Sequence, residues 1–155
     1  MTVGPTFFAT AAAAPAGHRY WRATALAVSS QDWQPTELQF WETSSVRADN
    51  ASTSLSHNST IYFGTIGNLV DGNVTVQVEL YPMASTNSVF WDFGLGVTKA
   101  VTGFKHADRG GAGPSGAFTA ITAQYSDDNS TWTTFGSATS VVFSGDTLSA
   151  FIPFI

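Results

Sequence analysis

No cysteine occurs among the 155 residues of this chain. Disulfide bonds, thiolate metal sites and cysteine nucleophiles are therefore excluded. Charged residues are also scarce. They make up 11% of the chain, whereas about 25% is usual in a globular protein.

The few charges are unbalanced. Six Lys and Arg residues against 11 Asp and Glu residues give a formal net charge of −5. Binding to nucleic acid depends on a basic surface that neutralises phosphates, and anionic membranes attract polybasic runs. Neither feature is present, and no segment approaches the roughly 20 apolar residues of a membrane span. We therefore expect no nucleic-acid partner and no membrane insertion.

The residues that replace the missing charges are mostly Ser, Thr, Gly and Ala, and aromatic residues reach 14%. A Thr-rich and aromatic-rich composition that is poor in helix formers favours strands. One domain is expected at this length.

Four short segments alternate apolar and polar residues with a period of two, which is typical of a strand with one buried face. They are residues 37–42, 74–81, 89–93 and 121–125. Less regular strands are expected at 20–28, 97–106, 131–135, 141–143 and 148–154. No segment has a sustained helical period. The pattern predicts an all-β sandwich of about eight strands.

Three stretches fall outside this pattern. Residues 43–60 form a polar run and residues 107–116 are rich in glycine, and long loops of this kind are often functional or disordered. Residues 1–16 contain no Lys or Arg, which argues against a secretory signal peptide. They form either an N-terminal arm that docks on a partner chain or an ordinary disordered terminus. One domain, residues 17–155, follows them.

Six local signatures stand in a fixed order along this domain. They are His-Arg-Tyr-Trp-Arg at 18–22, Glu-Leu-Gln-Phe at 37–40, Asn-Leu-Val-Asp-Gly-Asn at 68–73, Phe-Trp-Asp-Phe-Gly at 90–94, Val-Thr-Gly-Phe at 101–104 and Gln-Tyr-Ser-Asp-Asp-Asn-Ser-Thr-Trp at 124–132. Together they resemble the discoidin, or coagulation factor 5/8 type C, domain, which is a galactose-binding-like jelly roll. The opening His-Arg-Tyr-Trp-Arg is similar to versions of this domain in phage virion proteins.

The resemblance implies a structural calcium ion near Asp71 and Asn73, with the carbonyl of Leu69 as a further ligand. Calcium takes six to eight oxygen ligands. Two departures count against it: Val74 continues directly into a predicted strand, and residues 150–155 lack the acidic residue often found near the family's C-terminus. The sequence therefore leaves two interpretations of this turn, a calcium site and a metal-free turn.

The resemblance also implies that ligands bind at loops on one end of the sandwich. His106, Asp108 and Arg109 enter the Gly-rich loop after a predicted strand and offer donors and acceptors for sugar hydroxyls. Trp41 and Tyr81 are the aromatic candidates for stacking on a sugar, together with Trp33, His57 and Tyr62. Each of these side chains has an ordinary structural alternative, such as Trp41 covering an outer face of the sandwich.

No catalytic residue is expected, because the sequence contains no His-Glu-x-x-His, phosphate loop, Gly-x-Ser-x-Gly or dinucleotide fingerprint. We therefore do not expect an enzyme.

Three hypotheses of function follow from the resemblance. The first is a carbohydrate-binding adhesion module on a phage or phage-like virion, which engages cell-surface polysaccharide and gains avidity as a homo-oligomer. Its N-terminal arm would dock on other virion proteins. The second is a purely structural virion decoration or tail protein that binds no sugar. The third, weaker hypothesis is a module of a secreted bacterial glycosidase system.

Overall fold

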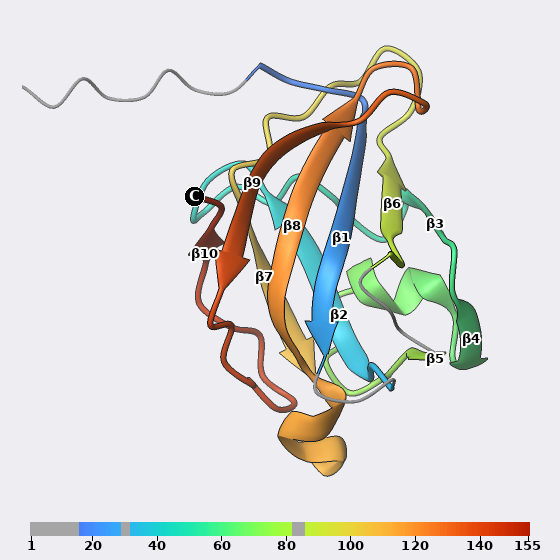
Figure 1. Ribbon diagram of the computed structural model, residues 1–155, viewed down its shortest axis with the longest axis vertical. Helices are drawn as coiled ribbons and strands as arrows, with labels where there is room; N and C mark the ends of the chain where they lie inside the picture. The colour runs from blue at the N-terminus through green and yellow to red at the C-terminus, as the bar shows by residue number, and fades with distance from the viewer. Residues whose placement is uncertain (1–15, 29–31, 82–85) are drawn as a thin grey trace, which may run out of the picture.

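A computed structural model describes residues 16–28, 32–81 and 86–155 of the chain. Two antiparallel sheets face one another across a hydrophobic core, and the prediction of an all-β sandwich is confirmed (Figure 1). The predicted N-terminal arm, residues 1–16, lies outside the described residues except for Ala16.

The larger sheet has five strands with β1 at its centre. Its order is β3 (Ser54–His57), β6 (Val89–Asp92), β1 (Tyr20–Val28), β8 (Phe118–Ser126) and β9 (Thr133–Thr139). Trp21 of β1 lies opposite Trp91 of β6 and Tyr125 of β8, so large aromatic side chains line the inner face. Such cross-strand aromatic pairs are the units that stabilise a sheet.

The smaller sheet has three strands, in the order β10 (Ile152–Pro153), β7 (Gly103–Asp108) and β2 (Pro35–Trp41). A separate two-stranded ribbon pairs β4 (Thr60–Phe63) with β5 (Glu79–Tyr81). Two 3₁₀ helices complete the fold, η1 (Ile66–Val70) and η2 (Gly110–Gly116). In Figure 1, η2 and the ribbon lie at the lower end of the sandwich, where β7 ends and β8 begins.

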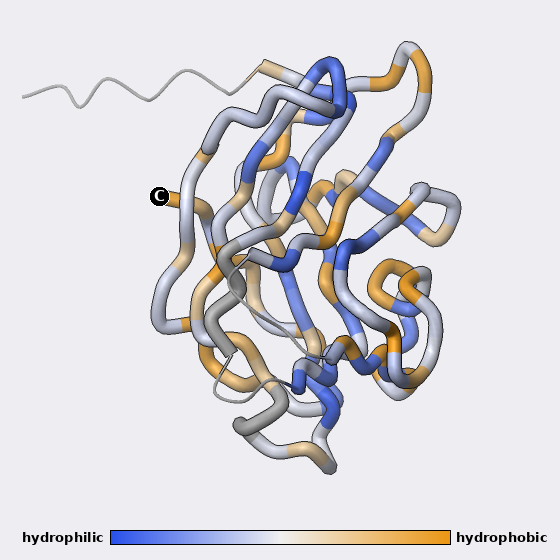
Figure 2. Tube along the Cα trace, turned by 45° about the vertical axis from the view of Figure 1, so that its right-hand side comes forward, coloured by the Kyte–Doolittle hydropathy of each residue, from blue (hydrophilic) through white to orange (hydrophobic). Residues whose placement is uncertain are grey.

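The core between the sheets is aromatic. Trp21, Phe40 and Trp91 are almost completely buried, and the rings of Phe40 and Trp91 lie 4.2 Å apart. Aromatic side chains of this size bury the largest apolar areas in a domain and dominate its stability. Figure 2 shows that hydrophobic residues come in short segments along the tube. No helix in the described part of the chain is long and apolar enough to cross a membrane.

The predicted strand at 74–81 is wrong in its first half, because the observed strand β5 begins only at Glu79. The side chain of Asn73 accepts hydrogen bonds from the N–H and the hydroxyl of Thr75, and the N–H of Val76 bonds to the Asn73 carbonyl. An Asn side chain that bonds to the backbone two residues ahead favours a turn over a strand. Val76 is consequently exposed, whereas Val78 and Leu80 are buried.

Other strand boundaries also differ. The strand expected at 97–106 begins at Gly103, and residues 141–143 form no strand. The polar run 43–60 contains β3, which the sequence pattern does not predict. This strand is stabilised by its pairing with β6, a contact made between distant parts of the chain.

Candidate functional site

A groove at the lower end of the sandwich is the candidate ligand site. Asp32, Tyr62, Glu79 and Tyr81 line it, and we call it the tyrosine groove. Its volume is about 270 Å³.

Three elements bring these four side chains together. Strands β4 and β5 pair with Thr60 opposite Tyr81. The register of this pairing shifts between Ile61 and Phe63, where Tyr62 lies. Trp33 and Leu80 exchange backbone hydrogen bonds of 3.2 and 3.0 Å. Because Trp33 and Leu80 are completely buried, they anchor the neighbouring groove residues to the core.

The tyrosine rings are unusually accessible. Tyr62 is 76% exposed and Tyr81 is 46% exposed. A tyrosine ring offers an apolar face together with a hydroxyl that donates and accepts hydrogen bonds. This combination suits a sugar, whose ring has a face of C–H groups and an edge of hydroxyls.

The charged side chains of the groove are acidic. Burial raises the pKa of Glu79, and the neighbouring Asp32 carboxylate raises it further, while Arg109 acts in the opposite direction. Gln34 connects these groups, because its amide nitrogen donates to Asp32 Oδ2 and its amide oxygen accepts from Arg109 Nη1 at 2.9 Å.

The structure separates the five side chains predicted from the sequence as ligand contacts. Tyr81 and Arg109 lie at this end of the sandwich, and Arg109 is exposed. His106 and Asp108 lie in β7, which ends just before Arg109, and are buried, with exposed fractions of 0% and 1%. His106 Nδ1 lies 3.3 Å from Asp108 Oδ2, which also accepts the N–H of Ser144 at 3.0 Å. Of the three predicted loop residues, only Arg109 reaches the surface.

Trp41 is the fifth predicted contact and lies at the opposite end of β2 from Gln34. A strand of this length separates its ends by about 20 Å. The ammonium of Lys105 lies 3.7 Å from the centre of the Trp41 ring, and the indole N–H donates to Gln39. Trp41 therefore covers an outer face of the smaller sheet.

Each of the two side chains proposed for calcium has an oxygen that accepts hydrogen bonds within its own turn. Asp71 Oδ1 accepts the N–H of Asn73 at 2.7 Å, and Asn73 Oδ1 accepts the hydroxyl of Thr75 at 2.7 Å. Among the described residues, no three acidic, His or Cys side chains are grouped to hold a metal ion. This arrangement fits calcium poorly, since calcium requires six to eight free oxygen ligands.

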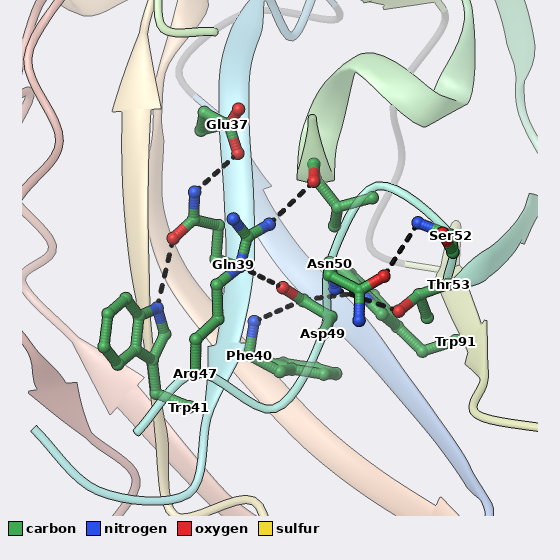
Figure 3. Close-up of polar contacts among 11 residues, drawn as sticks. Glu37, Gln39, Phe40, Trp41, Arg47, Asp49, Asn50, Ser52, Thr53 and Trp91 are labelled. Carbon is green, nitrogen blue, oxygen red and sulfur yellow. Dashed lines mark hydrogen bonds and ion pairs between the residues drawn. The ribbon is translucent and has the colours of Figure 1, made fainter. Parts of the chain in front are cut away.

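A guanidinium occupies the corner beside this turn. Arg47 donates from Nη2 to the carbonyl of Val70 at 2.8 Å and from Nε to Asp49 Oδ1 at 2.7 Å (Figure 3). The other oxygen of Asp49 accepts the N–H of Phe40 and the indole N–H of Trp91. Arg47 therefore joins the end of η1 to the buried carboxylate that holds β2 and β6 together.

Two carboxyl groups of this corner are buried and have raised pKa values. Burial raises the pKa of Glu37 to about 7, and Asp71 adds to the rise, whereas Gln39 and Arg47 act against it. Burial raises the pKa of Asp49 to about 6, against the opposing effect of Arg47. Figure 3 shows Glu37, Gln39 and Trp41 in a line of hydrogen bonds along β2.

Sequence reasoning did not single out Asp32, Gln34 or Glu79. A signal for Glu79 was present, since it shares a face with Tyr81 in any strand that contains both. No local signal marked Asp32, because its place beside Glu79 depends on the bridge between Trp33 and Leu80.

Comparison with known proteins supplies one match. The family model described as F5/8 type C domain matches residues 48–150, which is more than half of the chain. Strand β1, which precedes the matched residues, is the central strand of the larger sheet. Searches of curated proteins and of solved structures found no match.

Proposed function

Because this chain belongs to the F5/8 type C domain family, whose members are generally binding modules, we propose that it is a non-catalytic module that binds carbohydrate. The match to the family supports ligand binding in general. The choice of a saccharide and of its site rests on the chain's own residues.

The tyrosine groove carries this proposal. Two exposed aromatic rings, Tyr62 and Tyr81, flank a recess that also contains two carboxylates. Aromatic surface beside a few hydrogen-bonding groups is the general composition of small-ligand sites. Arg109, which borders the groove through Gln34, supplies further donors for hydroxyl groups.

Binding of the full chain to a panel of surface polysaccharides tests the proposal. Tyr62→Ala should weaken binding about tenfold, because one stacked ring contributes roughly 1.4 kcal/mol. Phe63→Ala is the matched control, since Phe63 is a neighbouring aromatic residue, 57% exposed, that does not line the groove. Absence of binding to every polysaccharide, even in multivalent display, would overturn the proposal and favour the structural role.

We further propose that the module is displayed as a homo-oligomer on a phage or phage-like virion, attached to other virion proteins through residues 1–16. The support is the similarity of residues 18–22 to virion versions of the domain. Many weak sites on one particle would give high avidity for cell-surface polysaccharide. Deletion of residues 1–16 should then abolish oligomerisation and leave the affinity of each single site unchanged.

We also propose that the turn at residues 71–73 needs no calcium. Its support is the set of hydrogen bonds that Asp71 Oδ1 and Asn73 Oδ1 accept within the turn.

A further inference from the structure

We propose that the tyrosine groove selects saccharides that carry a protonated amine, such as units of 2-amino-2-deoxyhexose. This inference rests on the proposed carbohydrate-binding function and names the class of sugar that the groove prefers. It is carried by a recess that two tyrosines and two acidic residues line together.

The described side chains that line the groove give it a negative charge. Asp32 and Glu79 line it, and no cation is among the described residues that do so. The positive charge that influences Glu79 is that of Arg109, whose Nη1 donates to Gln34. The net charge of −5 on the whole chain adds to the negative potential. A ligand that brings a positive charge is therefore favoured over a neutral one.

The hydrogen-bonding groups of the groove also favour an ammonium ligand. An ammonium group has three N–H donors and no acceptor, and ionised carboxylates have only acceptors. Hydrogen bonds between two such charged groups are shorter and stronger than those between neutral groups. A neutral ligand offers the two carboxylates no hydrogen bond of this charged kind.

The two aromatic rings favour an amino sugar independently of the carboxylates. The face of a tyrosine ring attracts cations as well as C–H groups, so Tyr62 and Tyr81 suit both parts of an amino sugar. Their exposed fractions of 76% and 46% leave these rings available to a ligand. The volume of about 270 Å³ lies just below the range of drug-sized pockets, which indicates a ligand of about one sugar ring.

The raised pKa of Glu79 agrees with this arrangement. Besides burial, repulsion between the charges of Glu79 and Asp32 raises this pKa. A bound ammonium would relieve this repulsion, because an opposite charge nearby favours the ionised carboxylate.

The test compares a glucosamine tetrasaccharide with its fully N-acetylated counterpart. The two differ only in the charge and acetylation of the nitrogen. Calorimetry with the full chain, at a mildly acidic pH where the amines are protonated, should show roughly tenfold tighter binding of the charged tetrasaccharide. Equal or tighter binding of the acetylated compound would overturn the inference and leave the proposed function standing. If the polysaccharide panel shows no binding at all, both fail together.

Three variants test whether the groove carboxylates cause the preference for the charged tetrasaccharide. Glu79→Gln and Asp32→Asn should each remove most of the preference for the charged tetrasaccharide, and either one suffices if the other does not fold. Asp127→Asn removes the same charge from an exposed side chain in the turn that follows β8, and should leave the preference unchanged. A preference that survives both groove variants, or that falls equally in Asp127→Asn, would show general attraction to an acidic chain and overturn the inference.

Discussion

Arg47 Nη2 donates a hydrogen bond of 2.8 Å to the carbonyl of Val70, the last residue of η1. The turn for which the family resemblance implies calcium begins at the next residue, Asp71. The guanidinium therefore brings a positive charge to the end of η1, beside the turn for which the resemblance implies a metal ion. Arg47 also pairs with Asp49, whose side chain is completely buried.

Removal of Arg47 should destabilise the protein whether or not calcium is present. Arg47→Ala leaves Asp49 buried without its ion-pair partner, and such a change costs about 3 kcal/mol. Urea denaturation should show this loss, and Arg47→Lys should lose less because it keeps the charge. Chelation of divalent cations should leave the melting temperature of the unaltered protein unchanged. A melting temperature that calcium raises and a chelator lowers would contradict the metal-free turn.

Stability should fall as the pH rises from about 4.5 to 7. The pKa of Glu37 is about 7 in the folded protein, against an ordinary value of 4.5, so between these values the folded state binds more protons than the unfolded state. The stabilisation from this group is fully present below about pH 4.5 and is lost as the pH rises towards 7. The loss amounts to at most about 3 kcal/mol. Asp49 acts in the same direction up to its pKa of about 6.

The free energy of unfolding measured by urea denaturation between about pH 4.5 and 8 checks this prediction. Glu37→Gln should flatten the dependence, because the amide does not titrate. The lowered pKa of Asp92 acts only below about pH 4, outside this range. An unchanged slope in Glu37→Gln would show that another group is responsible.

Gly103→Ala should destabilise the smaller sheet. A Cβ atom at this position would meet the carbonyl of Ile152 and the ring of Phe151, and the backbone of β10 cannot easily move away. Overpacking of this kind costs roughly 1–3 kcal/mol. Gly67→Ala is the control, since a Cβ atom there meets nothing within 4 Å. Thermal unfolding should separate the two variants by several degrees, and similar melting temperatures would contradict the close contact.

Substitution of two predicted aromatic contacts should distinguish their roles. Tyr81→Ala should weaken saccharide binding about tenfold, because Tyr81 lines the groove. Trp41→Ala should change the affinity less than about twofold, since Trp41 packs beneath Lys105 on an outer face. Titration of the same polysaccharide against both variants compares them directly. A larger loss in Trp41→Ala would move the site to the other end of β2.

The sequence by itself determined the features that depend on neighbouring residues. The strand predicted at 20–28 coincides with β1, and Leu38 and Phe40 are buried as their alternation indicates. The turn after β8 contains Asn129 with a φ of 58°, a conformation that Asn tolerates and that its residue type therefore favours. The family resemblance is confirmed over residues 48–150, which contain four of its six short signatures.

Only the tertiary structure decided which polar side chains are buried and which distant residues meet. Glu37 and His106 lie on strands whose two faces are both covered, so their burial cannot be recognised from alternation alone. The tyrosine groove exists because Trp33 pairs with Leu80 and thereby brings Asp32 beside Glu79 and Tyr81. A local pattern reports the conformation of a segment and one of its faces, whereas a binding site depends on pairings between segments far apart in the chain.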